Sequence, residues 1–258
     1  MKKLIALLLA LTMVLAMTAC GGEKDDKGGK SEKNTKPTTE ATTEATTEPT
    51  TEPTTEPTTE PTTEPTTAPT EPATEPVEEG PVLGSVEGDT YSNEFLGLSF
   101  TAGSGWVYAN NEQLAQMVGL SADALTPENF QRTLDTAGVA MVMYASSADG
   151  LVTANIVLED LVRNQAQHIT ATQYADLLQN NVAAALENLG ATDVETKRGE
   201  AEFAGEQCPV TLMHGTIKGV DLFEAQVYIK CGDYMVCITL ASYGENHIDQ
   251  VVAMFQGI

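Results

Sequence analysis

The sequence predicts one α+β domain over residues 80–258, built on an antiparallel meander of strands. The composition changes near residue 80, from a stretch with almost nothing that could enter a core to one of ordinary globular character. Near the C-terminus, four strand-like segments follow one another through three short turns, each of which contains a glycine. Before them, apolar residues recur at helical spacing in several stretches. About 175 residues suit a single domain with a sizeable core.

The first 19 residues are typical of a signal peptide. A basic start precedes an apolar run from Leu4 to Met17, which is shorter than the ~20 residues of a membrane-spanning helix. The run leads into Thr18-Ala19-Cys20, which resembles a bacterial lipobox. The sequence therefore predicts lipidation of the Cys20 sulfur and an anchor on the outer face of the cell membrane, because two acyl chains anchor stably. The alternative is ordinary secretion, with cleavage after Ala19 and a free thiol.

Residues 20–79 are predicted to be a disordered stalk behind the lipidated Cys20. Repeats of Thr-Thr-Glu-Ala and then Thr-Thr-Glu-Pro fill most of it, and nothing apolar recurs that could offset the entropy of ordering. At ~3.1 Å per residue in the polyproline II conformation, the part from residue 37 to 79 reaches ~130 Å at most. Such a spacer would project the domain into or beyond a cell wall. Glycosylation of the threonines and binding to a reader of proline-rich motifs remain alternatives.

The first half of the domain alternates short strands and short helices. Thr126-Pro127-Glu128 has the cap, proline and acid of a helix start, and Gly138 stands where a helix-ending glycine would. A Ser-Ser-Ala-Asp-Gly turn separates the two longer strands. The strands expected here are 91–95, 98–101, 106–108, 139–145 and 151–158, with helices around 114–118 and over 126–137.

The second half holds the clearest helix and the meander. Thr172 is the expected cap of a helix that Gly190 ends, with Tyr174, Leu178 and Val182 on its apolar stripe. The strands expected after it are 191–203 with a kink near Arg198-Gly199, 207–217, 221–231 and 234–242. Apolar residues at helical spacing from Ile248 to Phe255 predict a last helix.

Two turns predict the strand registers. A Gly232-Asp233 loop pairs Cys231 with Tyr234, and a Gly219-Val220 loop would bring Cys208 opposite Cys231. Cross-strand neighbours are close enough for a disulfide, so a Cys208–Cys231 bridge is a candidate, with reduced core cysteines as the alternative. In this register Val210, Leu212, Val227, Ile229, Val236 and Ile238 share one face, and the other face is half-apolar.

Several residues and the order of elements resemble the PsbP-like superfamily, which is named for an extrinsic subunit of photosystem II and includes small bacterial lipoproteins. The resemblance covers roughly residues 88–258 and rests on Tyr91-Ser92-Asn93, Gly97-Leu98-Ser99-Phe100 and Gly105-Trp106. It implies an α/β/α sandwich around the antiparallel sheet. It also implies a binding or assembly role, because members of the group share no set of catalytic residues.

No motif for catalysis, metal or cofactor binding stands out in the chain. The cysteines lack the spacing of a zinc site, and no nucleophile context accompanies His214. Glu159-Asp160 is an acidic pair that we expect in a solvated loop rather than in a catalytic or Ca²⁺ site. Trp106 is expected to be a core or interface anchor, with contact to a ligand or partner as the alternative.

The net charge of −24 argues against nucleic-acid binding, because residues 80–258 alone carry 22 acidic side chains against six basic ones. The leading expectation is a non-catalytic, lipid-anchored surface protein that binds a partner in the cell envelope. A small-molecule or solute-binding lipoprotein with a pocket near Trp106, and a hydrolase whose site only folding assembles, are the alternatives.

Overall fold

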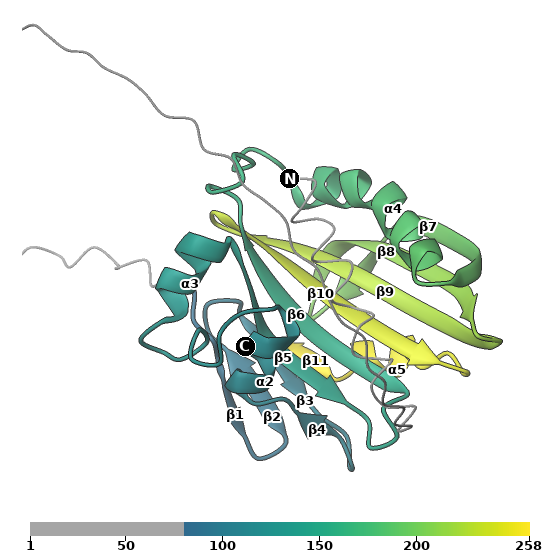
Figure 1. Cartoon of the computed structure of the whole chain (residues 1–258), viewed down its shortest axis with the longest axis horizontal. Helices are drawn as coiled ribbons and strands as arrows, with labels where there is room; N and C mark the ends of the chain where they lie inside the picture. The colour runs from purple at the N-terminus through teal and green to yellow at the C-terminus, as the bar shows by residue number, and fades with distance from the viewer. Residues whose placement is uncertain (1–79) are drawn as a thin grey trace, which may run out of the picture. The chain divides into compact units, whose positions relative to one another are not determined.

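A computed structural model describes residues 80–258 (Figure 1). The predicted signal peptide (1–19), lipidated Cys20 and stalk (20–79) lie outside the described residues. The described part is a mixed α+β fold with two antiparallel sheets, and its core runs continuously between them.

The larger sheet has seven strands in the order β4-β5-β6-β10-β9-β8-β7. All its pairings are antiparallel, and its last four strands in the chain form the predicted meander. Its strands are β4 (Val107–Tyr108), β5 (Val139–Ser146), β6 (Val152–Asp160), β7 (Ala191–Phe203), β8 (Glu206–Ile217), β9 (Val220–Cys231) and β10 (Tyr234–Tyr243). The expected kink of β7 near Arg198-Gly199 is not observed, and the register irregularity lies between Thr192 and Glu195.

The smaller sheet has four strands in the order β1-β2-β3-β11 and joins the two ends of the domain. Its strands are β1 (Ser85–Glu87), β2 (Thr90–Asn93), β3 (Leu98–Thr101) and β11 (Phe255–Gly257). Phe255 was expected on a last helix, but that helix, α5, covers only Ile248–Val252. Phe255 instead pairs with Phe100 of β3, because this places its ring 4.7 Å from the Phe100 ring in the core.

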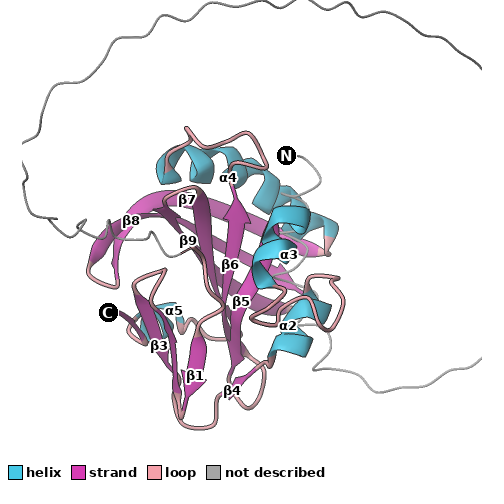
Figure 2. Cartoon of the chain, turned by 90° about the vertical axis from the view of Figure 1, so that its left-hand side faces the viewer, coloured by secondary structure: helices cyan, strands magenta, loops and turns pink. Residues whose placement is uncertain are grey.

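The two faces of the larger sheet are covered differently. Tyr174 of α4 (Ala171–Asn188) packs against Tyr228 on one face, which we call the helix face. On the opposite face, Phe203 of β7 packs against Phe255 of the smaller sheet. Figure 2 shows the smaller sheet and the helices α2 (Asn111–Met117) and α3 (Phe130–Ala137) on opposite sides of β5 and β6. The expected sandwich with helices on both faces is therefore corrected: a second sheet and the short α5 cover one of them.

One predicted register is confirmed and the other is wrong. Cys231 pairs with Tyr234 as expected. In the preceding hairpin Ile217 pairs with Val220, so the turn residues are Lys218 and Gly219, both of which have positive φ (52° and 82°). Such a two-residue turn needs positive φ at both positions, which Gly219-Val220 would not provide. The partners shift by two residues, which leaves every side chain on its predicted face because strand side chains alternate with period two.

The shift removes the geometric argument for the disulfide. Continuing the observed register puts Ile229, not Cys231, opposite Cys208. Cys208, Cys231 and Cys237 are free thiols in the structure.

Two helix starts differ from the expected ones. The cap of α4 is Thr170, whose hydroxyl accepts from Gln173 N while the Gln173 side chain accepts from Thr170 N. This capping box satisfies two backbone donors at the start of the helix. Thr172 lies inside the helix, so its side chain does not cap these donors. Helix α3 begins at Phe130, because residues from Thr126 to Asn129 form a turn closed by the Phe130 N to Thr126 O hydrogen bond. Gly138 ends α3 as predicted, with φ at 76° and its N–H bonded to Leu134 O.

Gly138 gives a test of this helix end. A Cβ at Gly138 would lie 2.7 Å from Cδ of Arg163, and the left-handed backbone is strained for any other residue. We expect Gly138→Ala to lower the free energy of unfolding by about 1–2 kcal/mol, measured by chemical denaturation. Gly119→Ala is the matched control, since Gly119 has a similar φ of 72° but open space around its Cα. An equal loss for both variants would contradict the contact with Arg163.

Candidate functional site

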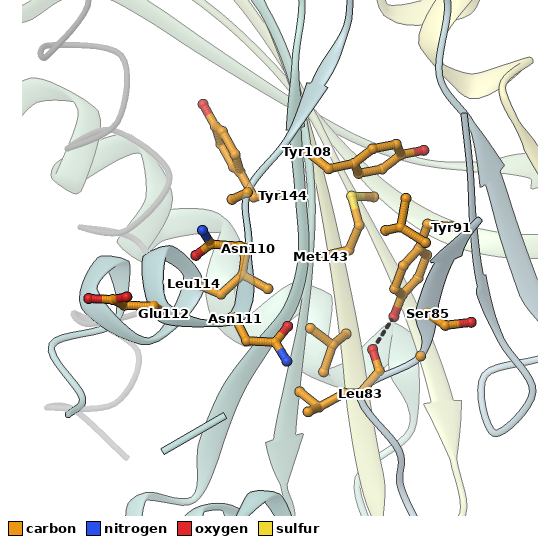
Figure 3. A pocket seen from close by; sticks show the side chains of 14 residues that line it. Leu83, Ser85, Tyr91, Tyr108, Asn110, Asn111, Glu112, Leu114, Met143 and Tyr144 are labelled. Atoms are coloured by element: carbon orange, nitrogen blue, oxygen red, sulfur yellow. Dashed lines mark hydrogen bonds between the residues drawn. The ribbon is translucent and has the colours of Figure 1, made fainter. Parts of the chain in front are cut away.

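An open cleft of about 670 Å³ lies beside the edge of the larger sheet (Figure 3). One wall is the first segment of the domain with β1 and β2, and the other is the start of α2. Between them lie β4 and β5, which contribute Tyr108, Met143 and Tyr144. The volume falls within the ~300–1,000 Å³ of typical ligand pockets.

Hydrogen bonds hold the tyrosine walls of the cleft in place. The Tyr91 hydroxyl donates to Leu83 O over 2.8 Å and accepts from Asn93 Nδ2 over 2.9 Å. The Tyr108 hydroxyl lies 2.9 Å from Phe100 O and 3.0 Å from Asp89 O. Burial raises the pKa of Tyr91 and, to a smaller extent, that of Tyr108. Both phenols therefore stay neutral and serve as fixed walls rather than as acids or bases.

The start of α2 forms the polar side of the cleft. Asn110 caps the helix: its Oδ1 accepts from Gln113 N, and its own N–H donates to the Gln113 side chain. Asn111 and Glu112 follow at the exposed rim, and Figure 3 shows the Asn111 side chain directed across the cleft toward Leu83. The buried Leu114 supplies apolar surface below them.

The wall opposite α2 ends in an edge strand. β1 pairs only with β2, so its other side is a free edge of the smaller sheet. Its three residues are exposed, and Ser85 and Val86 line the cleft. Free strand edges present unpaired backbone donors and acceptors, so an extended chain can pair with them.

The residues singled out from the sequence lie elsewhere. The Trp106 ring packs edge-on against Phe100 at 5.7 Å and does not line the cleft, although Tyr108 two residues later does. Burial raises the pKa of Cys208 to about 11 and that of Cys237 to about 12, and it also raises the pKa of Cys231. These thiols are therefore protonated and poor nucleophiles near neutral pH.

Glu159 was expected in a solvated loop, and this expectation is wrong. Its side chain is buried under α4, where it accepts hydrogen bonds from the Tyr174 hydroxyl and, over 2.6 Å, from Asn164 Nδ2. Burial raises the pKa of Glu159, and the two hydrogen bonds oppose that rise. Asp160 is the last residue of β6 and is half-buried, and its Oδ1 accepts from the N–H groups of Val162 and Arg163 in the turn that follows.

The described residues contain no group of three or more His, Cys, Asp or Glu side chains that could hold a metal ion. His214 stacks on Phe223 at 4.7 Å and lies 3.7 Å from Asp221, and His247 lies 3.8 Å from Glu245. Neither histidine lines the cleft. Within residues 80–258, no helix has the length and apolar character needed to cross a membrane.

Sequence reasoning missed the residues that make the cleft. Tyr91, Tyr108 and Tyr144 are far apart in the chain and come together only because β2, β4 and β5 meet at one end of the fold. The apolar Val82-Leu83 pair just after the stalk was one available signal, because such residues need a buried partner.

No family model matches the chain, and no curated protein matches it either. The solved structures that resemble part of this chain include two bacterial proteins. PA94 from Pseudomonas aeruginosa, a protein of unknown function, is 21% identical over 35% of this chain and 58% of its own length, with a TM-score of 0.24. LpqN from Mycobacterium tuberculosis, involved in cell envelope biogenesis, is 8% identical over 61% of this chain and 76% of its own length, with a TM-score of 0.31. These scores assign no fold family, so the function is argued from the site alone.

Proposed function

We propose that the chain is a non-catalytic binding protein of the cell surface, anchored through Cys20, whose cleft takes an extended segment of an envelope protein. The observation that supports this most is the free edge of β1 beside a floor of tyrosine and aliphatic side chains. An extended peptide that pairs with a strand edge gains affinity from main-chain hydrogen bonds. Pockets that accept every second side chain of the peptide supply specificity. The resemblance to PsbP-like lipoproteins, with their binding and assembly roles, belongs to the same proposal.

The chemistry of the cleft supports binding rather than catalysis. Its tyrosine hydroxyls at 91 and 108 are engaged by backbone carbonyls, and Ser85 is its one hydroxyl nucleophile of the serine or threonine type. Catalytic serines need an adjacent base within hydrogen-bond reach. No histidine lines the cleft, and its one carboxylate, Glu112, accepts a hydrogen bond from Gln116 Nε2 over 3.1 Å.

The proposal predicts site-specific cross-linking in intact cells. A photo-reactive amino acid at Val86, which is 46% exposed on β1, should cross-link to one envelope protein. The same amino acid at Leu177, 55% exposed on α4, should not. Asn111→Trp should fill the cleft and reduce the Val86 product about tenfold, because a blocked anchor pocket removes most of the binding energy. Leu177→Trp is the matched control and should leave the product unchanged.

A second function is favoured by the volume of the cleft, which also suits a small solute. In that case a solute would raise the midpoint of thermal unfolding of the full chain, Asn111→Trp would abolish the rise, and no cross-link would form at Val86. A Val86 product that persists in Asn111→Trp would contradict both functions for this cleft.

A further inference from the structure

The free edge of β1 offers the backbone of Val86 to a pairing chain. β1 and β2 are joined by the two-residue turn Gly88-Asp89, and Gly88 has the positive φ (60°) that the first position of a type II′ turn requires. The flanking residues Glu87 and Thr90 form a hydrogen-bonded pair, and such pairs alternate along an antiparallel ladder. The N–H and C=O of Val86 therefore point away from β2. No backbone hydrogen bond from another element reaches them within residues 80–258.

A second hollow, of about 410 Å³, adjoins the cleft along the first segment of the domain. Leu83, Gly84 and Ser85 line both the cleft and this second hollow. The apolar walls of the second hollow include Val82 and Phe130. Successive side chains of an extended chain point to opposite sides, so a chain that runs beside this segment can place side chains in both.

Every charged side chain that lines the cleft or the second hollow is acidic. Glu112 lines the cleft and Glu94 lines the second hollow, while no lysine, arginine or histidine lines either. Burial raises the pKa of Tyr108 in the cleft, and the negative charge of Asp89, in the turn next to β1, adds to that rise. All three acidic side chains are exposed, so a ligand at this surface meets their charge.

No basic side chain of this part of the fold compensates that charge. Residues 80–131 supply the lining of both hollows except for three residues of β5, and they contain six acidic residues and no lysine or arginine. Arg132, the next basic residue of the chain, lines neither hollow. Glu94, Glu112 and Asp89 take part in no ion pair within the described residues. The cleft therefore keeps a negative field that a bound partner can neutralise.

We infer that the segment taken by the cleft is basic: an extended stretch of polypeptide in which lysine or arginine alternates with aliphatic residues. The aliphatic side chains would fill the hollows, and the basic ones would lie near the acidic rim. Opposite charges across an interface speed association, and like charges reject wrong partners. Further copies of this chain, with a net charge of −24, are among the rejected ones. This assignment rests on the proposed function, because it names the chemistry of the segment that the cleft takes.

The test uses the full chain, purified from membranes, with a photo-reactive amino acid in place of Val86. Three labelled seven-residue peptides alternate valine with lysine, with serine or with glutamate, and the concentration that gives half of the maximal cross-linked product is measured for each. We expect this concentration to be about tenfold lower for the lysine peptide than for the serine peptide, because several exposed charge pairs add up. The glutamate peptide should give no product. Salt at about 0.5 M should remove most of the difference, since it screens exposed charges.

Two double variants with the same net charge locate the effect. Glu94→Gln with Glu112→Gln should remove most of the preference for lysine and leave the serine peptide unchanged. Glu200→Gln with Glu202→Gln is the matched control and should keep the preference, because both residues are exposed on β7 at the far edge of the larger sheet. The acidic stalk is the same in both variants, so it does not contribute to the difference between them.

The inference is overturned if the lysine peptide binds no better than the serine peptide, or if both double variants lose the preference equally. Equal cross-linking of the lysine and serine peptides would leave the proposed function in place, because the cleft would still take an extended chain. No product with any peptide, together with no Val86 product in intact cells, would overturn the proposed function itself.

Discussion

Phe100→Ala should lower the free energy of unfolding by about 3–5 kcal/mol, the range for removal of a buried aromatic ring. Phe100 is fully buried on β3, and its ring lies 4.7 Å from Phe255, 5.7 Å from Trp106 and 6.1 Å from Tyr108. It therefore holds together the smaller sheet, β4 and the C-terminal strand. Since domains of this size are stable by only ~5–15 kcal/mol, this loss would leave a marginal fold.

Chemical denaturation followed by the fluorescence of Trp106 would measure the effect, because this is the only tryptophan and it contacts Phe100. Phe95→Ala is the matched control: Phe95 is half-buried and packs edge-on against Tyr234 at 5.7 Å, so its loss should be clearly smaller. If Phe100→Ala fails to fold, Phe100→Leu keeps most of the volume and should show a reduced loss. Similar stability of Phe100→Ala and Phe95→Ala would mean that Phe100 does not join the two sheets.

Cys20→Ser should release the protein from membranes or leave it unprocessed. The oxygen of serine does not replace the thiolate that a lipobox cysteine offers for lipidation, and stable anchoring depends on the attached acyl chains. Separation of membrane and soluble fractions, with the mass of the N-terminal peptide, would measure the change. We expect nearly all wild-type protein, and almost none of the processed variant, in the membrane fraction.

Cys231→Ser provides the control for this experiment. Cys231 is a partly exposed free thiol of the domain, and its replacement should leave the membrane fraction unchanged. A processed Cys20→Ser protein that stays with the membrane would contradict the anchor and would point to another means of attachment.

Local patterns in the sequence predict most helices and strands well, because interactions between residues close in the chain largely decide where they form. The apolar stripe of α4, the glycine after α3 and the alternation in β8, β9 and β10 are visible in any window of the chain. The turn at Gly219 was predicted one position too late, and this displaced the strand partners by two residues. Val210 and Val227 still lie on their predicted face, because strand side chains alternate with period two. The sequence alone could not decide between two glycine turns that differ by one position.

Contacts between distant segments were not predictable in this way. Phe255 follows helical spacing, yet pairing with Phe100 places it in a strand, because tertiary packing overrides a short local preference. Glu159 looked like a loop residue because its partners, Tyr174 and Asn164, come from later elements. The cleft is likewise made by strand pairing, so it leaves no compact motif in the sequence.

The place of β11 has a consequence for how the molecule is made. Phe255 to Gly257 are among the last residues of the chain, yet they complete a sheet whose other strands are the first of the domain. The ring of Phe255 therefore cannot pack against Phe100 and Phe203 between the two sheets until residues 255–257 can pair with β3. A chain that leaves the ribosome or passes a pore with its N-terminus first would therefore keep the smaller sheet incomplete until residues 255–257 have emerged. Deletion of these last residues would affect the first strands rather than only the tail.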